Sequence, residues 1–230
     1  MREEVITVRL HDPVRLRGSV LPLLRQPAVA WFLASVFFTV LAHTSLYAFF
    51  SLFLVHAGHG KQAVGALWAV SVAMEILFFR LQGRWFNRLS PHGWLAVAAG
   101  VTVLRFAGMA LGGAQVWLLV LAQLTHAVTF AAHHAACIAL VSRHFPGRLR
   151  GRGQALYSAL GYGLSGLLGG VGGGWLVERA GFGALYGVAA LAGLVGLGRG
   201  QPQRDAVRLG HGLALLAHRD LQLRFPAQAL

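Results

Sequence analysis

The chain of 230 residues is too apolar to form a water-soluble domain. Hydrophobic residues make up 56% of it and charged residues 12%, and its mean hydropathy is +0.61, whereas a typical soluble domain carries about 25% charged residues. This composition also excludes intrinsic disorder, which requires low hydrophobicity and high charge. The single cysteine, Cys137, excludes a disulfide framework and a cysteine-based zinc site. The formal net charge is +13, and it would indicate nucleic-acid binding only if the basic residues formed one face.

The first 27 residues are polar and precede the first apolar run. They hold five arginines together with Glu3, Glu4 and Asp12. The apolar run that follows is about twice as long as the apolar core of a signal peptide, so we predict no cleavable signal. We expect residues 1–27 to form a cytoplasmic N-terminal segment.

Six apolar runs follow, and five of them are long enough to cross a bilayer at 1.5 Å per residue. The five clear runs cover roughly residues 28–55, 94–111, 116–141, 155–177 and 181–197. The weaker run, 63–79, contains Glu75 and ends at Arg80. We therefore predict an all-α membrane protein with six transmembrane helices in one domain, residues 28–198. Six such runs leave no amphipathic helix or strand to cover them, which argues against the buried core of a soluble protein.

The basic residues indicate the topology of these helices. If both termini are cytoplasmic, 17 of the 20 lysines and arginines lie on the cytoplasmic side, Lys61 and Arg179 lie outside, and Arg105 lies within a helix. This bias follows the positive-inside rule. Because the arginines are spread over short loops, they form no single basic face for nucleic acid. The cytoplasmic tail, 199–230, either is loosely ordered or forms a short interfacial helix that includes residues 213–216.

Small residues recur at helical spacing in the fifth run. One row is Gly166, Gly170 and Gly174, and a second is Gly161, Ser165, Gly169 and Gly173. In a bilayer, small residues stabilise helix pairs because they let two backbones approach closely. The two rows imply two closely packed neighbours, and they serve either packing alone or the sliding and bending of helices during a transport cycle.

Three ionisable residues are expected near the middle of the membrane. Counted from the helix ends, Glu75 is about 18 Å deep, Arg105 about 16 Å and His126 about 15 Å. A charge near the bilayer centre costs on the order of 3 kcal/mol and normally faces the protein interior. We expect the three to meet, either as an ion pair that fixes helix register or as part of a pathway for protons or a polar solute, with Arg105 binding the solute.

Further polar residues extend this candidate site. In the fourth run, one row of side chains is Thr129 and His133, at i+3 and i+7 from His126, and a second row is Phe130 and His134, at i+4 and i+8. Residues at these spacings lie on one broad face of a helix.

In the first run, His43 and Tyr47 form an i, i+4 pair that lines the same cavity or hydrogen-bonds to a neighbouring helix. A metal site of His133, His134 and Glu75 is disfavoured, because adjacent histidines on a helix point about 100° apart. No cofactor is expected.

The chain lacks sequence motifs that ATP-driven pumps and enzymes normally carry. It has no Walker-type nucleotide loop, which argues against an ATP-driven pump. It has no nucleophile motif and no paired carboxylates within the membrane, so nothing specific supports an intramembrane enzyme.

Several ordered segments together resemble a known family. They run from His43 to Ser51, Leu67 to Ala69, Glu75 to Phe79, Gln123 to Ala136 and Phe145 to Ser158. The chain, over roughly residues 22–198, resembles the major facilitator superfamily, and within it the 3-phenylpropionate permease-like transporters related to lactose permease.

The resemblance implies an architecture and roles for the central residues. Members have two six-helix halves, each built from two inverted three-helix repeats around a midplane site. This chain looks like the second half, preceded by the end of the central loop. In the lactose permease type, an acid, an arginine and a histidine followed three residues later by an acid take part in substrate binding and proton coupling. Glu75, Arg105 and His126 match the first three positions, but Thr129 stands at the fourth, which leaves Glu75 as the candidate proton carrier.

The resemblance implies a secondary transporter, or part of one, in the bacterial inner membrane. We expect proton-coupled uptake of a small polar or anionic solute by alternating access, with an N-terminal half or a second copy as partner. Aromatic acids, nucleosides and sugars all suit the polar residues. The alternative is a truncated non-transporting membrane protein or a component of a six-helix assembly.

Overall fold

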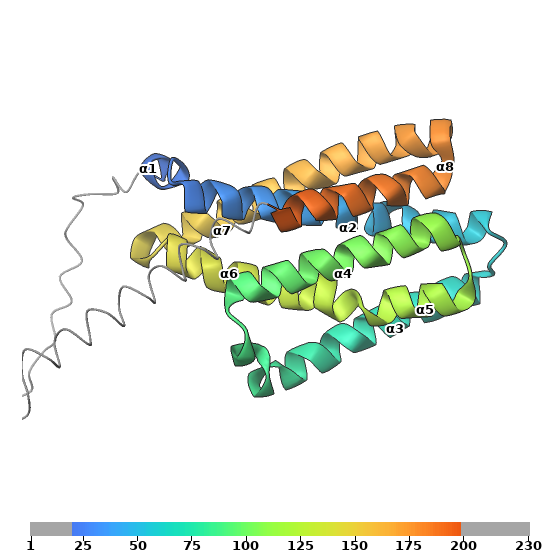
Figure 1. Cartoon of the computed structure of the whole chain (residues 1–230), viewed down its shortest axis with the longest axis horizontal. Coiled ribbons are helices and arrows are strands. Elements are labelled where there is room, and N and C mark those ends of the chain that lie inside the picture. The colour runs from blue at the N-terminus through green and yellow to red at the C-terminus, as the bar shows by residue number, and fades with distance from the viewer. Residues whose placement is uncertain (1–19, 199–230) are drawn as a thin grey trace, which may run out of the picture.

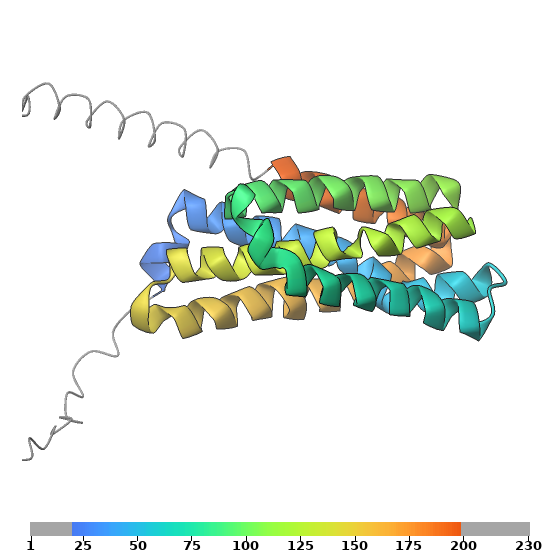
Figure 2. The same cartoon turned by 90° about the horizontal axis from the view of Figure 1, so that it is seen from below.

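The computed structural model describes residues 20–198. Within this range every regular element is helical, and the long helices run roughly parallel to one axis (Figures 1 and 2). Most of the predicted N-terminal segment and the whole tail 199–230, including the proposed interfacial stretch 213–216, lie outside the described residues.

Eight α-helices and five shorter helical turns make up this part of the chain. In order they are α1 (Leu21–Leu24), α2 (Pro27–His56), α3 (Lys61–Leu81), η1 (Gln82–Arg84), η2 (Phe86–Arg88), α4 (Pro91–Gly112), α5 (Val116–Leu124), η3 (Ala127–Ala132), α6 (His133–His144), η4 (Gly147–Leu149), α7 (Arg150–Ser158), η5 (Ala159–Leu164) and α8 (Ser165–Gly198). The turns η3 and η5 are π-helical, and the other three are 3₁₀.

The ends of the long helices follow local sequence signals. Proline occupies the first turn of α2 and of α4, where its missing N–H costs no hydrogen bond. The hydroxyl of Ser90 accepts a hydrogen bond from the Gly93 N–H at 3.1 Å and so caps α4. Gly113, with φ of 62°, ends that helix in a conformation that favours glycine.

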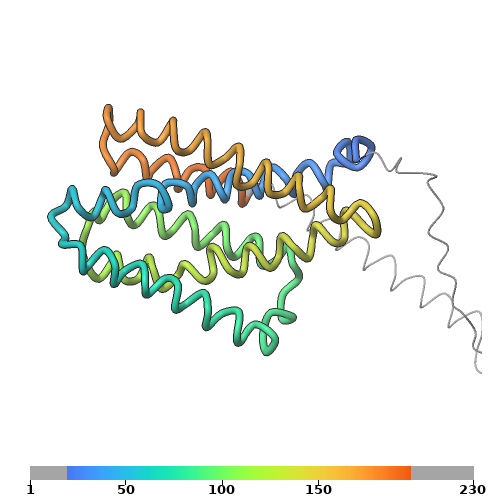
Figure 3. Tube along the Cα trace, turned by 180° about the vertical axis from the view of Figure 1, so that it is seen from behind, coloured from blue at the N-terminus to red at the C-terminus, as the bar shows by residue number. Residues whose placement is uncertain are grey.

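Five segments of the described chain are long and apolar enough to cross a membrane, where the sequence predicted six. They are Pro27–His56, Lys61–Arg84, Pro91–Gly112, Val116–His144 and Gly147–Leu197. The last has 51 residues, which far exceeds the roughly 20 that a bilayer requires. Its backbone is non-helical at Gly181 (φ 77°, ψ 178°), and there α8 folds back on itself (Figures 1 and 3). The chain is an all-α, multi-pass membrane protein.

The fifth predicted helix begins earlier than hydropathy indicated. The helical path starts at Arg150 and continues through α7 and η5 into α8, so Arg150 and Arg152 lie on a helix and not in a loop. Hydropathy misses this start because arginine and glutamine are polar, although both are good helix formers.

The apolar core consists of two clusters, one toward each end of the bundle. Phe32 and Phe145 belong to the first, and Phe50 and Phe106 belong to the second. Along α2, buried members of the first cluster extend as far as Val40, and those of the second begin two residues beyond it, at Ala42. Several buried polar residues lie near this boundary on three helical segments: Thr39, His43, Thr102, Arg105, Gln123, His126 and Thr129. The bundle therefore holds a polar layer between two apolar ones.

Only one of the two glycine rows faces a neighbouring helix in the described structure. A Cβ atom at Gly169 would lie 2.7 Å from the Thr44 side chain, and one at Gly173 would lie 2.6 Å from the Phe49 ring. This row therefore packs closely against α2. A Cβ atom would meet nothing within 4 Å at Gly166, Gly170 or Gly174. The second closely packed neighbour that was predicted for these three glycines has no counterpart within residues 20–198.

Candidate functional site

His126 lies between two charged residues from two other helices. Its Nε2 is 2.9 Å from Oε1 of Glu75 on α3, and its Nδ1 is 2.9 Å from an Nη of Arg105 on α4. His126 itself precedes η3 and is 1% exposed. The structure thus brings together the three residues that the sequence placed at one depth, with the histidine as the link between acid and base.

The partners of His126 determine which ring nitrogen carries the proton. A guanidinium only donates hydrogen bonds, so Nδ1 of His126 accepts from Arg105. The remaining nitrogen, Nε2, then carries the hydrogen and donates to the Glu75 carboxylate. In this arrangement the positive charge of Arg105 acts on Glu75 through a neutral imidazole.

Arg105 is held by two further acceptors. One Nη donates to Oγ1 of Thr129 at 3.1 Å, and the other donates to Oε1 of Gln123 at 2.7 Å. The side chain is 5% exposed, whereas the sequence predicted that Arg105 binds the solute. Gln123 was not predicted as a site residue, although an amide three residues before His126 in an apolar helix is a detectable signal.

A π-helical turn runs through the site. In η3 the Phe130 ring is stacked on His126, with centroids 5.4 Å apart and planes 2° apart, and it is stacked on His134 at 6.1 Å and 18°. The two histidines therefore lie on opposite sides of one phenylalanine. Such π-turns are rare and occur frequently at functional sites.

The Glu75 end of the network reaches the surface of the bundle. The Glu75 side chain is 23% exposed and Tyr47 is 45% exposed. The Tyr47 hydroxyl is 3.5 Å from Nε2 of His126, and its ring is stacked on Trp68 with centroids 6.3 Å apart. A solute that approaches this face would meet the carboxylate and two aromatic rings.

His43 lies beside the network without a hydrogen bond to it. Its Nδ1 donates to the Thr39 carbonyl of its own helix at 2.8 Å, and its ring centroid is 6.1 Å from that of His126. Its Nε2 has no partner among the described residues. It therefore forms no hydrogen bond with a neighbouring helix in this part of the chain.

His134 belongs to a second polar cluster. Its Nδ1 is 2.9 Å from the Tyr157 hydroxyl and 3.3 Å from that of Tyr162, and the two hydroxyls are 3.1 Å apart. Tyr157 is 1% exposed and Tyr162 is 36% exposed, so this cluster also extends from the interior to the surface. Neither tyrosine was predicted as a site residue.

Tyr47, Glu75 and Tyr162 are partly exposed polar groups within predicted membrane spans. Ring contacts of Phe130 with Tyr47, His126 and His134 connect the two polar clusters into one strip. Polar side chains inside a membrane face protein or a water-filled cavity.

The profile of the MFS_1 like family matches residues 5–188. The chain belongs to this family of the major facilitator superfamily. It is 34% identical over 161 residues to a protein of Escherichia coli (strain K12) described as a probable 3-phenylpropionic acid transporter. The aligned residues make up 70% of this chain and 42% of that protein. The chain is 21% identical over 185 residues to the uncharacterized transporter YwbF of Bacillus subtilis (strain 168), and the aligned residues make up 80% of this chain and 46% of YwbF.

The resemblance to the 3-phenylpropionate permease-like group is thereby confirmed. The chain spans less than half the length of either relative. No solved structure matches it.

Proposed function

We propose that this chain forms a six-helix half of a secondary transporter that works by alternating access. The family match and the share of each relative that the chain covers support this proposal. Six crossings follow if the two arms of α8 on either side of Gly181 each cross the membrane, since the other four spans cross once. In this proposal the six helices form two inverted repeats, as in other transporters of this architecture.

The membrane topology and the need for a partner are part of the same proposal. The bias of basic residues supports cytoplasmic termini in a bacterial inner membrane. The exposed polar strip supports a second six-helix half, or a second copy, across a central cavity. The row Gly166, Gly170 and Gly174 has open space beside it, which suits close packing with that partner.

Coupling to protons is proposed to occur at Glu75. The observation that carries this proposal is the continuous chain from Glu75 through His126 to Arg105, with only the acid partly exposed. When Glu75 loses its proton, the hydrogen on Nε2 of His126 and the charge of Arg105 stabilise the carboxylate. When Glu75 gains a proton, its carbonyl oxygen still accepts the same hydrogen bond. Both states are therefore accommodated without breaking the network.

The solute is proposed to be a small organic anion with an apolar ring. The name of the Escherichia coli relative suggests an aromatic acid, and the rings of Tyr47, Trp68 and Phe130 offer a matching apolar wall. Because Arg105 is buried and already hydrogen-bonded, its proposed role is to balance the charge of Glu75, and not to bind the solute.

The test compares Glu75→Gln with wild type in proteoliposomes that contain the transporter with both halves present. With one proton per anion, a pH difference of one unit sustains about a tenfold accumulation of 3-phenylpropionic acid. We expect the variant to lose this accumulation but to keep exchange of internal for external solute. Glu178→Gln, which changes an exposed acid on α8, is the matched control and should accumulate solute as wild type does.

Unchanged accumulation in Glu75→Gln would contradict the proposed role of this residue. If the wild-type protein moved none of a panel of aromatic acids, nucleosides and sugars, the chain would instead belong to a non-transporting membrane protein.

A further inference from the structure

An apolar groove lies between α2 and the two arms of α8, away from the polar strip. Its volume is about 400 Å³, which is within the range of pockets that hold small molecules. Its wall includes Leu41 from α2, Leu168 and Gly172 from the first arm of α8, and Leu185 and Val188 from the second arm. Leu168 and Val188 are each 50% exposed, so the groove is accessible from outside the bundle at these two residues.

The helical repeat of α8 explains why the groove and the unpaired glycine row face different directions. Leu168, Gly172 and Trp175, which all line the groove, recur at i, i+4 and i+7 and so share one face of the helix. Gly170 and Gly174 are each two residues from Gly172, and at 100° per residue they lie on nearly the opposite face. A partner that packs on the row of Gly170 and Gly174 would therefore leave the groove open to lipid.

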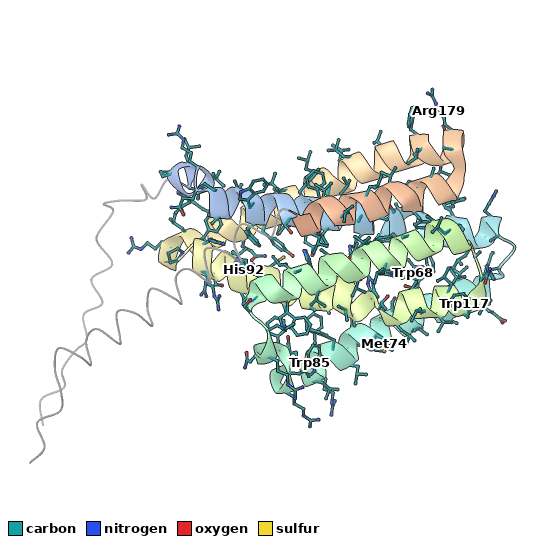
Figure 4. The ribbon with its side chains drawn as sticks, in the orientation of Figure 1. Trp68, Met74, Trp85, His92, Trp117 and Arg179 are labelled. Carbon is teal, nitrogen blue, oxygen red and sulfur yellow. The ribbon has the colours of Figure 1, made fainter. Side chains whose placement is uncertain are left out.

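A positive charge lies at one end of the groove. The guanidinium of Arg179 is 4.6 Å from the ring centroid of Trp175, and Trp175 itself lines the groove. Arg179 projects outward from the end of the first arm of α8, next to the fold-back at Gly181 (Figure 4). It forms no ion pair with a described carboxylate. Tryptophan and arginine are typical of the level at which lipid headgroups meet the apolar core.

We propose that this groove binds one acyl chain of a phospholipid whose phosphate pairs with Arg179. Arg179 is the eleventh residue after Leu168, which corresponds to about 16.5 Å along the helix. One leaflet of a bilayer core is about 15 Å thick, so an acyl chain attached to a headgroup at Arg179 reaches the far end of the groove. Guanidinium groups bind phosphate through paired hydrogen bonds, and the apolar walls exclude competing polar ligands.

Native mass spectrometry of the full chain in mild detergent tests the proposal with two defined lipids. Dioleoylphosphatidylglycerol carries a phosphate, and dioleoylglycerol has the same acyl chains without it. We expect Gly172→Leu, whose side chain fills the groove, to weaken binding of both lipids by at least about tenfold, the effect of leaving two methylene groups unburied. Gly170→Leu, the matched control on the opposite face, should bind both lipids as wild type does. Arg179→Gln should weaken only the binding of dioleoylphosphatidylglycerol.

Photo-crosslinking of the unaltered chain provides a measurement that does not depend on a variant being stable. A phosphatidylglycerol with a diazirine at the end of one acyl chain should label the groove residue Leu168 in preference to Leu167, which is on the neighbouring face of α8. Equal lipid binding by Gly172→Leu and Gly170→Leu, or equal labelling of Leu167 and Leu168, would overturn the proposal. It would also be overturned if Gly172→Leu changed the oligomeric state and not lipid binding, since a second copy would then occupy the groove.

Discussion

Close packing of α8 against α2 predicts opposite effects for the same substitution on two sides of one helix. In Gly169→Ala the new Cβ would lie 2.7 and 2.8 Å from the Thr44 side chain and 3.2 Å from Leu41. Ordinary contact begins at 3.4 Å, so the two helices must separate locally by about 0.7 Å, the difference between that contact and the shortest distance. Overpacking of this kind costs about 1–3 kcal/mol. In Gly170→Ala the Cβ meets nothing within 4 Å, and alanine favours the helix by up to about 1 kcal/mol.

The free energy of unfolding of the two variants provides the measurement. Purified chains in mixed micelles would be unfolded with sodium dodecyl sulfate and followed by tryptophan fluorescence and circular dichroism. We expect Gly169→Ala to be less stable than wild type and Gly170→Ala to be as stable or more stable. If the two variants had the same stability, or if Gly170→Ala were the weaker, the glycine row that faces α2 would be assigned incorrectly.

The same unfolding assay tests three more sites. Arg105→Lys should lower the free energy of unfolding by about 1–3 kcal/mol, because an ammonium group lacks the planar fork of donors that a guanidinium offers to its three acceptors, His126, Thr129 and Gln123. A loss smaller than that of an exposed arginine variant would contradict this role. Gly181→Ala should lower the free energy of unfolding by about 1–3 kcal/mol, since φ of 77° with ψ of 178° is tolerated almost only by glycine. Gly187→Ala, within the second arm of α8, should not lower it. Tyr157→Phe should lose about 1–2 kcal/mol through its buried hydroxyl, and more than Tyr162→Phe; the reverse order would place the burial incorrectly.

Most of the helices were predictable from the sequence because a bilayer selects for long apolar runs. The weaker run was recognised despite Glu75, and it corresponds to α3. Hydropathy predicted two separate runs, 155–177 and 181–197, whereas the structure has one helical segment there that reverses direction at Gly181. A single backbone conformation decides this point, and hydropathy does not report backbone angles.

The depth of the site residues was also predictable, but their mutual orientation was not. A rise of 1.5 Å per residue placed Glu75, Arg105 and His126 at similar depths, and the structure brings them into contact. Depth does not fix the rotation of a helix about its axis. The sequence therefore could not show that His126 lies between the two charges, or that Gln123 and Thr129 complete the set of acceptors around Arg105.

The two glycine rows illustrate the same limit. Both follow helical spacing, and the sequence alone gave no reason to distinguish them. In the structure the row that includes Gly169 and Gly173 faces α2, whereas the row that includes Gly170 has open space beside it. Which row meets a neighbour depends on the positions of α2 and the second arm of α8, and therefore on tertiary structure.

The π-turn η3 keeps the rings of His126, Phe130 and His134 in one stacked column although the two histidines are eight residues apart. In a regular α-helix, eight residues advance by 800°, so His134 would be turned about 80° away from His126. A π-turn accommodates one additional residue, and the rings of His126, Phe130 and His134 are stacked across it. Deleting that additional residue would leave His126 and His134 seven positions apart in a regular α-helix, which advances by 700° and keeps the two rings within about 20° of one face. In an alignment of related sequences, a one-residue gap at this position would therefore mark chains that keep these rings on one face with a regular α-helix in place of the π-turn.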